Sequence, residues 1–284
     1  DSALRGARGS IVFSSPRADG EFTSYELMLL ALPSFVETQL TSDLSDNVFP
    51  HGSADGRWVA FQSDRDDDDD NVPDTDIYVV NRGGGQLRAL TDNPVFDRVP
   101  AWSPDGEWLV YASDVQGNGA YDLYRVRADG SGHEALLSNN LRASQPRYHP
   151  DGGRLVFTLG NDPTDARTWE IATLDIASGR VDILTTNYTR DASPMYSPDG
   201  SQILYITFNG QDNAIAVMDA NGDNQRILYD SDGNDYAAAY SPDGDYIVFS
   251  SDLDGSDQLY IMTPNGEHVQ QITSTGGLVP HWMP

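Results

Sequence analysis

Carboxylates are the most abundant reactive side chains in this 284-residue sequence, and a dense group of them lies between residues 64 and 76. Alternate carboxylates along a short loop can surround one hard cation with oxygen ligands. Like charges this close also repel one another unless a cation neutralises them. The segment therefore predicts a calcium site, with a solvated acidic loop as the alternative. The predicted ligands are Asp66, Asp68, Asp70 and Asp74.

Two further segments, 230–235 and 252–257, share the pattern Asp-x-Asp-Gly-x-Asp. The pattern is weak evidence in either segment alone, because Asp-Gly is common turn chemistry. If the two segments lie side by side, their carboxylates also predict a calcium site. The predicted ligands are Asp230, Asp232, Asp235, Asp252, Asp254 and Asp257.

Arginine supplies all 17 basic residues, and four arginines lie in or beside three consecutive expected loops. A guanidinium binds a carboxylate through two parallel hydrogen bonds, so this group predicts a basic patch for a carboxylate. Tyr188 and Tyr236 lie in the same set of loops and can provide stacking surface for a peptide or a sugar. The alternative is that each arginine neutralises a neighbouring aspartate. The four arginines are Arg98, Arg142, Arg147 and Arg190.

A repeat of 44–50 residues organises the whole chain. The anchor Ser-Pro-Asp-Gly occurs at 103–106, 197–200 and 241–244, with weaker copies at 53–56 and 149–152. Each anchor is followed by a strand that ends in an aromatic residue, a second strand, a glycine-rich turn and a closing strand. This spacing is typical of one four-stranded propeller blade.

The two ends of the chain predict a closed ring. Residues 280–284 copy the first strand of a blade at 100–104, whereas residues 9–14 copy a second strand. Pairing of these ends completes a sixth blade and removes exposed sheet edges. We therefore expect an all-β, six-bladed β-propeller of four-stranded antiparallel blades in a single domain, residues 1–284. The expected blades are 8–44 with 278–284, then 47–93, 97–139, 143–187, 191–231 and 235–275.

The anchor Pro-x-aromatic-Ser-Pro-Asp-Gly and the closing Leu-Thr pairs, as at Leu90-Thr91 and Leu184-Thr185, resemble the TolB-like six-bladed β-propeller repeat family. The resemblance covers residues 8–284 and concerns the propeller part, without the N-terminal domain of TolB. Similar repeats occur in the propellers that gate some prolyl peptidases. The resemblance implies a fold rather than one function.

Alignment of the repeats places two more sets of polar residues near the channel. Asp97 and Asp191 stand three residues before the proline of the anchor, where they form a polar ring or hold their own loops by Asx-type hydrogen bonds. His51 and His281 each follow that proline in adjacent blades. Two inner-strand histidines can form a metal site or an acid–base pair, and simple packing is the alternative.

Composition excludes several classes of partner. With 17 basic and 44 acidic residues the net charge is −27, which disfavours nucleic acid and anionic membranes. No apolar run is long enough to span a bilayer, so we expect no membrane insertion. The first residue is Asp1 rather than Met, which fits a chain whose leader is absent. We expect a periplasmic or extracellular location.

Together these patterns favour a non-catalytic binding module, with calcium as a stabilising ion. Its expected ligand is a protein segment or a small polar or carbohydrate molecule at the loop face, since loops around a propeller channel vary without disturbing the scaffold. A polysaccharide lyase or glycoside hydrolase acting at the channel mouth is an alternative. A structural component of an extracellular assembly is another.

Overall fold

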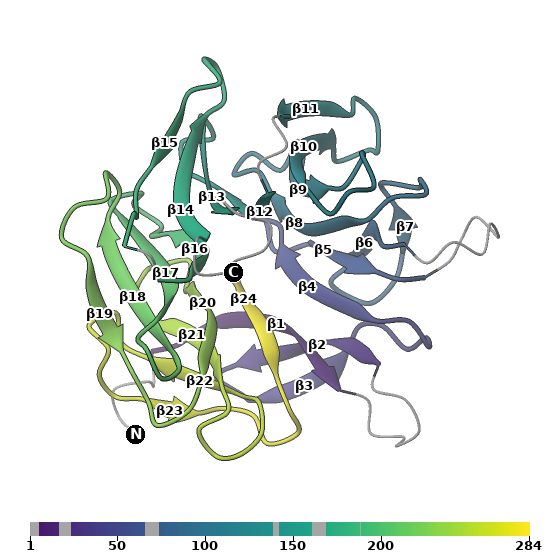
Figure 1. Cartoon of the computed structure of the whole chain (residues 1–284). Helices are drawn as coiled ribbons and strands as arrows, with labels where there is room; N and C mark the ends of the chain where they lie inside the picture. The colour runs from purple at the N-terminus through teal and green to yellow at the C-terminus, as the bar shows by residue number, and fades with distance from the viewer. Residues whose placement is uncertain (1–5, 17–23, 66–73, 139–141, 161–168, 188) are drawn as a thin grey trace.

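The computed structural model describes residues 6–16, 24–65, 74–138, 142–160, 169–187 and 189–284. Within these ranges the chain forms β-strands and no α-helix. Figure 1 shows six sheets arranged around a common axis, with the C-terminal strand β24 at the centre. The predicted six-bladed propeller of four-stranded antiparallel sheets is confirmed.

In each blade the first strand named is the inner one, and the others follow outward. The first three blades are β24 (Leu278–Met283), β1 (Gly9–Pro16), β2 (Tyr25–Leu32) and β3 (Val36–Gln39); β4 (Asn47–Gly52), β5 (Trp58–Ser63), β6 (Asp76–Asn81) and β7 (Arg88–Ala89); and β8 (Asp97–Trp102), β9 (Trp108–Ser113), β10 (Asp122–Arg127) and β11 (Glu134–Leu137). The other three are β12 (Arg142–Tyr148), β13 (Arg154–Gly160), β14 (Trp169–Asp175) and β15 (Val181–Ile183); β16 (Asp191–Tyr196), β17 (Gln202–Phe208), β18 (Asn213–Asp219) and β19 (Arg226–Tyr229); and β20 (Asp235–Tyr240), β21 (Ile247–Ser251), β22 (Gln258–Met262) and β23 (Gln270–Gln271).

The ring is closed by the first blade, in which β24 pairs antiparallel with β1. Ile11 lies opposite Trp282 in this register. The Trp282 indole is buried and donates a hydrogen bond to the carbonyl of Arg8 over 2.8 Å. Pairing of the two chain ends, as the sequence predicts, therefore completes the blade.

Each Ser-Pro-Asp-Gly anchor forms the turn between an inner strand and the next strand. In the turn of the third blade the Ser103 hydroxyl donates to Asp105 over 2.5 Å and accepts the backbone N–H of Trp108 over 2.9 Å. Gly106 has φ +71°, a left-handed conformation that glycine adopts without steric cost. The anchor is therefore a self-contained turn, and its recurrence sets the blade period.

The core lies between blades rather than within one sheet. Alternate residues of β1 illustrate this: Ile11 packs with Val248 of the last blade, whereas Val12 packs with Val59 of the next blade. Successive side chains of a strand point to opposite faces, so a strand that is apolar on both faces packs against both neighbouring blades. Every blade depends on its neighbours for burial.

In several blades a threonine that follows the outermost strand forms hydrogen bonds with the third strand. Thr91 accepts the backbone N–H of Ile77 over 2.9 Å and donates to the Asp76 carboxylate over 2.7 Å. The same arrangement recurs with Thr41 and Glu26, Thr185 and Glu170, and Thr273 and Gln258. These polar groups are buried and hydrogen-bonded, which a stable interior requires. The loop face above them is thereby held in a fixed place.

Candidate binding site

The inner strand of every blade carries one residue in a left-handed conformation, immediately before the anchor proline or its equivalent. The φ values range from 45° to 54°, and the sheet register shifts at this point in every blade. A bulge of this kind re-aims side chains, and non-glycine residues with positive φ concentrate at functional sites. All six side chains line the axial channel. They are Phe49, Val99, Gln145, Ser193, Ala237 and Val279.

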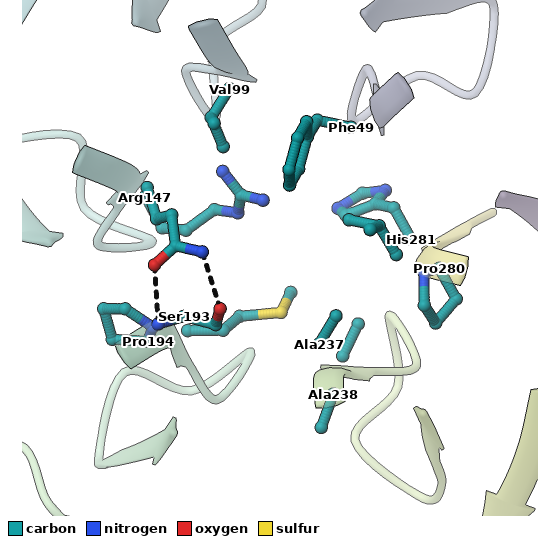
Figure 2. A pocket seen from close by; sticks show the side chains of 13 residues that line it. Phe49, Val99, Arg147, Ser193, Pro194, Ala237, Ala238, Pro280 and His281 are labelled. Carbon is teal, nitrogen blue, oxygen red and sulfur yellow. Dashed lines mark hydrogen bonds between the residues drawn. The ribbon is translucent and has the colours of Figure 1, made fainter. Parts of the chain in front are cut away.

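Figure 2 shows this ring from close by, with Phe49 and Val99 projecting into the channel. Gln145 bridges two blades, because its amide donates to the Ser193 hydroxyl over 2.8 Å and accepts the Ser193 backbone N–H over 2.9 Å. The ring is therefore rigid on this side. A rigid, shaped channel mouth is a suitable platform for a ligand.

A groove of about 310 Å³ opens beside the ring on the loop face. Arg98 and Arg142 line it, together with Tyr121 and Trp169. The Arg98 guanidinium lies 5.0 Å from the centre of the Tyr121 ring and 4.8 Å from that of Phe96. Burial raises the pKa of the Tyr121 hydroxyl, while the positive charges of Arg98 and Arg142 act in the opposite direction. Both cations therefore converge on one aromatic side chain.

Three buried polar atoms in this groove have no hydrogen-bond partner within the described part of the chain. They are the Nε atoms of Arg98 and Arg142 and the Oε1 atom of Gln62. Neither arginine forms an ion pair with a described residue, although the protein carries a large excess of carboxylates. Buried donors without partners are costly, so such groups call for a ligand or water.

The other predicted arginines lie elsewhere. Arg190 donates to the Asn213 side chain over 2.6 Å and does not line the groove. Arg147 lies deeper, in the wall of the axial channel. The structure therefore brings together two of the four predicted arginines. Tyr236 donates its hydroxyl to Asp252, away from the groove, and Tyr188 lies outside the described residues.

Asp97 and Asp191 are buried beneath their loops. Asp97 accepts a hydrogen bond from Asn93 over 2.8 Å, and Asp191 accepts one from Asn187 over 3.0 Å. Burial raises the pKa of both carboxyls. Both donors are side-chain amides, so these contacts tie each carboxyl to its own loop without forming an Asx-type turn, in which the donor is a backbone N–H.

His51 and His281 lie together in the channel wall, with ring centres 3.8 Å apart. Each Nδ1 accepts a backbone N–H, from Trp102 over 3.3 Å and from Gly52 over 3.1 Å. Burial lowers the pKa of both rings, and for His281 to about 3. Both imidazoles are therefore neutral near pH 7, each with its proton on Nε2.

The acidic segments are placed only in part. Asp66, Asp68 and Asp70 lie outside the described residues, whereas Asp74 is within them. The segments 230–235 and 252–257 do lie side by side, because the Asn234 backbone N–H donates to Asp252 over 2.7 Å. Among the described residues no group of three or more carboxylates and imidazoles is arranged to hold a metal ion. Calcium binding by these segments stays a prediction.

No sequence pattern marks several residues of the groove and the channel mouth. Phe49 and Gln145 directly precede the anchor prolines, a position whose alignment shows no common residue type. Gln62 and Trp169 lie at the ends of strands β5 and β14 that face the loops. The register shift one residue before each proline is the signal that identifies the channel-facing positions, and it is visible only in the structure.

Comparison with known proteins identifies the family. A family model described as the TolB beta propeller domain matches residues 69–234 and 192–284. The chain belongs to this family. TolB from Acinetobacter baumannii, a solved structure, superimposes with a TM-score of 0.77 over 96% of this chain and 66% of that one, at 20% identity. At that identity the likeness shows the fold alone.

Two curated relatives match parts of this TolB-like propeller. The uncharacterized peptidase YuxL of Bacillus subtilis is 30% identical over 150 residues, which cover 41% of this chain and 22% of the relative. The Tol-Pal system protein TolB 1 of Novosphingobium aromaticivorans is 38% identical over 74 residues, 26% of this chain and 16% of the relative. The chain thus spans less than half the length of these curated relatives. No helix in the described ranges is long and apolar enough to cross a membrane.

Proposed function

We propose that this propeller is a non-catalytic binding module that takes a carboxylate-bearing polypeptide segment in the loop-face groove. The observation that carries the proposal is the pair Arg98 and Arg142. Both line one groove, both keep a buried Nε atom without a partner, and neither is neutralised by a described carboxylate. Glu and Asp side chains fit guanidinium forks through bidentate hydrogen bonds.

The aromatic walls of the groove support a polypeptide as the occupant. Phe49, Tyr121 and Trp169 provide apolar surface beside the two cations. Aromatic and arginine side chains together are the usual anchors of protein interfaces. Similarity to a protein named as part of the Tol-Pal system supports a role in protein interaction and, with it, a periplasmic or extracellular location.

The test compares two peptides of equal length, fluorescein-labelled hexaglutamate and hexaglutamine. Binding is measured by fluorescence polarisation in 0.15 M NaCl, where a Debye length of about 8 Å screens the long-range repulsion of this acidic protein. We expect hexaglutamate to bind more tightly. The double variant Arg98→Ala with Arg142→Ala should lose about tenfold or more in affinity, since a charge-assisted hydrogen bond contributes about 1.5–3 kcal/mol.

A matched control double variant has the same net charge as the Arg98→Ala, Arg142→Ala double variant. The double variant Arg57→Ala with Arg180→Ala removes two exposed arginines that lie outside the groove. It should bind hexaglutamate like the parent protein. Equal losses in both double variants would contradict the groove proposal. Turnover of polygalacturonate or alginate by the purified protein would also contradict it and favour a lyase or hydrolase.

A further inference from the structure

Arg147 is the one charged side chain that lines the axial cavities among the described residues. One cavity, of about 40 Å³, is partly open and is lined by the six bulge residues and their neighbours, and a second, of about 240 Å³, opens toward the Ser-Pro-Asp-Gly turns. Arg147 and His281 border both cavities. Although the chain has 44 acidic residues, no Asp or Glu is found in either lining. Among the described side chains of the two linings, Arg147 is therefore a cation with no carboxylate side chain beside it.

The hydrogen bonds of Arg147 leave most of its guanidinium unused. Its Nη1 donates to the carbonyl of Pro146 over 2.9 Å, and no ion pair with a described residue forms. Burial lowers the pKa of Arg147 to about 10, so the side chain remains charged at pH 7. Arg147 is partly buried, and a charge that is partly removed from water costs free energy unless it is paired and hydrogen-bonded. The guanidinium has five N–H donors, and the hydrogen bond to Pro146 is the one that it forms with the described residues, so four donors remain available to a ligand or to water.

The histidines add neutral donors at the same level of the channel. Because Nδ1 of both His51 and His281 accepts a backbone N–H, the Nε2 atom of each ring carries its proton. Figure 2 shows the Arg147 guanidinium and the His281 ring projecting into the channel from opposite sides. The arrangement offers N–H donors and no acceptor charge, which is the chemistry of an anion site.

We propose that a small monovalent anion, either a carboxylate such as formate or acetate or a halide, binds in the axial channel beside Arg147. The smaller cavity, of about 40 Å³, exceeds the 10–15 Å³ that one water requires. Its volume suits a small ion rather than a large one. The wider cavity gives access from the turn side. This site is separate from the loop-face groove.

The opposing interpretation is that the field of the surface carboxylates stabilises Arg147 without any ion. A net charge of −27 favours a buried cation and opposes an anion at long range. The two interpretations differ in one measurable respect. General salt effects on stability act on every variant alike, whereas a bound ion gives an anion-dependent stability gain that requires Arg147.

The experiment measures thermal unfolding in sodium salts of formate, acetate, chloride, bromide and gluconate, at equal sodium concentration and ionic strength. Gluconate is too large for the smaller cavity, of about 40 Å³, and its Tm serves as the baseline. We expect Tm to rise above the gluconate value for one or more of the small anions, with the formate and chloride arms separating carboxylate from halide. The variant Arg147→Met should fold, since Met195 already occupies the equivalent position of the next blade. It should lose this specific rise in Tm, because the guanidinium is gone.

Arg190→Met is the matched control, because Arg190 bonds to Asn213 and lines neither cavity. It should keep the anion-specific rise. If Arg147→Met does not fold, crystals of the parent protein in sodium bromide decide the question. Anomalous density for bromide beside the Arg147 guanidinium supports the site. The same dependence of Tm on the anion in the parent protein and in Arg147→Met, together with an absence of bromide from the channel, would overturn it.

Discussion

A buried carboxyl at the start of β6 shows how single residues set the behaviour of this propeller. Asp76 accepts the Thr91 hydroxyl, and Thr91 in turn accepts the backbone N–H of Ile77. Burial raises the pKa of Asp76 to about 7 despite the hydrogen bond from Thr91. Burial also raises the pKa of Asp235 to about 6. These carboxyls serve as hydrogen-bond acceptors, and their ionisation destabilises the folded state.

The raised pKa of Asp76 predicts how stability changes with pH. In the unfolded chain Asp has a pKa of about 3.9, so between about pH 4 and pH 7 the folded state keeps a proton that the unfolded state has lost. The contribution of Asp76 to stability is therefore complete below about pH 4 and is lost as pH rises to about 7. Asp76→Asn keeps the acceptor for Thr91 but cannot ionise. We expect its Tm to exceed that of the parent protein at pH 8, with a difference that shrinks toward pH 5.

Scanning calorimetry between pH 5 and pH 8 measures this difference in Tm. A change of one kcal/mol in the free energy of unfolding shifts Tm by about 2–4 °C for large domains. Asp55→Asn is the control, because the Ser53 hydroxyl holds the pKa of the exposed Asp55 carboxyl below its usual range. That variant should not gain stability at pH 8. A Tm difference between Asp76→Asn and the parent protein that is constant over the whole range would contradict the prediction.

At the residue scale, the sequence predicted local turn chemistry well and channel chemistry poorly. The Ser-Pro-Asp-Gly turn is encoded within six residues, so its form follows directly from sequence. Whether Arg98 and Arg142 share a groove while Arg190 does not depends on the bulge in each inner strand and on contacts between blades. Those are long-range features that no local pattern contains.

Among the strands, β24 has the most specific role. It pairs with β1 across the two ends of the described chain and supplies the inner strand of the first blade. Trp282 is the centre of this contact, since it stacks on Tyr246 of the last blade with ring centres 5.9 Å apart and bonds to the carbonyl of Arg8. One side chain therefore joins the N-terminal segment, the C-terminal segment and the last blade.

We expect Trp282→Ala to destabilise the propeller by about 3–5 kcal/mol, the usual cost of removing a large aromatic side chain from a core. Urea unfolding followed by circular dichroism measures the change. Phe35→Ala is the control, because Phe35 lies in the β2–β3 turn and is 48% exposed. A loss of less than about 1 kcal/mol at Trp282 would mean that ring closure does not depend on this contact.

At the element scale, the sequence was most informative where periodicity is strong. The anchor repeats and the two incomplete ends were sufficient to predict the blades and the closure. The loops were less predictable, because their course depends on side-chain contacts between loops, such as those of Asn234 with Asp252. The acidic residues 66–70 lie outside the described residues, so the predicted calcium site there stays a prediction.

For the molecule as a whole, the arrangement of charge is the most informative property. The surface is strongly acidic, yet the loop-face groove and the axial channel are lined by arginines without ionic partners among the described residues. Long-range repulsion by this surface slows the approach of anions, whereas the two proposed sites would attract them locally through their guanidinium groups. A ring of six blades creates both sites, because neither the groove nor the channel belongs to one blade.

Binding in the groove is tested most directly by the arginine side chains themselves. In protein labelled with ¹⁵N at arginine, the Nε–H signals of Arg98 and Arg142 are identified by their loss in Arg98→Ala and Arg142→Ala. We expect hexaglutamate to shift these two signals, since their donors have no hydrogen-bond partner among the described residues, and to leave that of Arg190 unchanged. Peptide binding that leaves both groove signals in place while other arginines shift would contradict the proposed function.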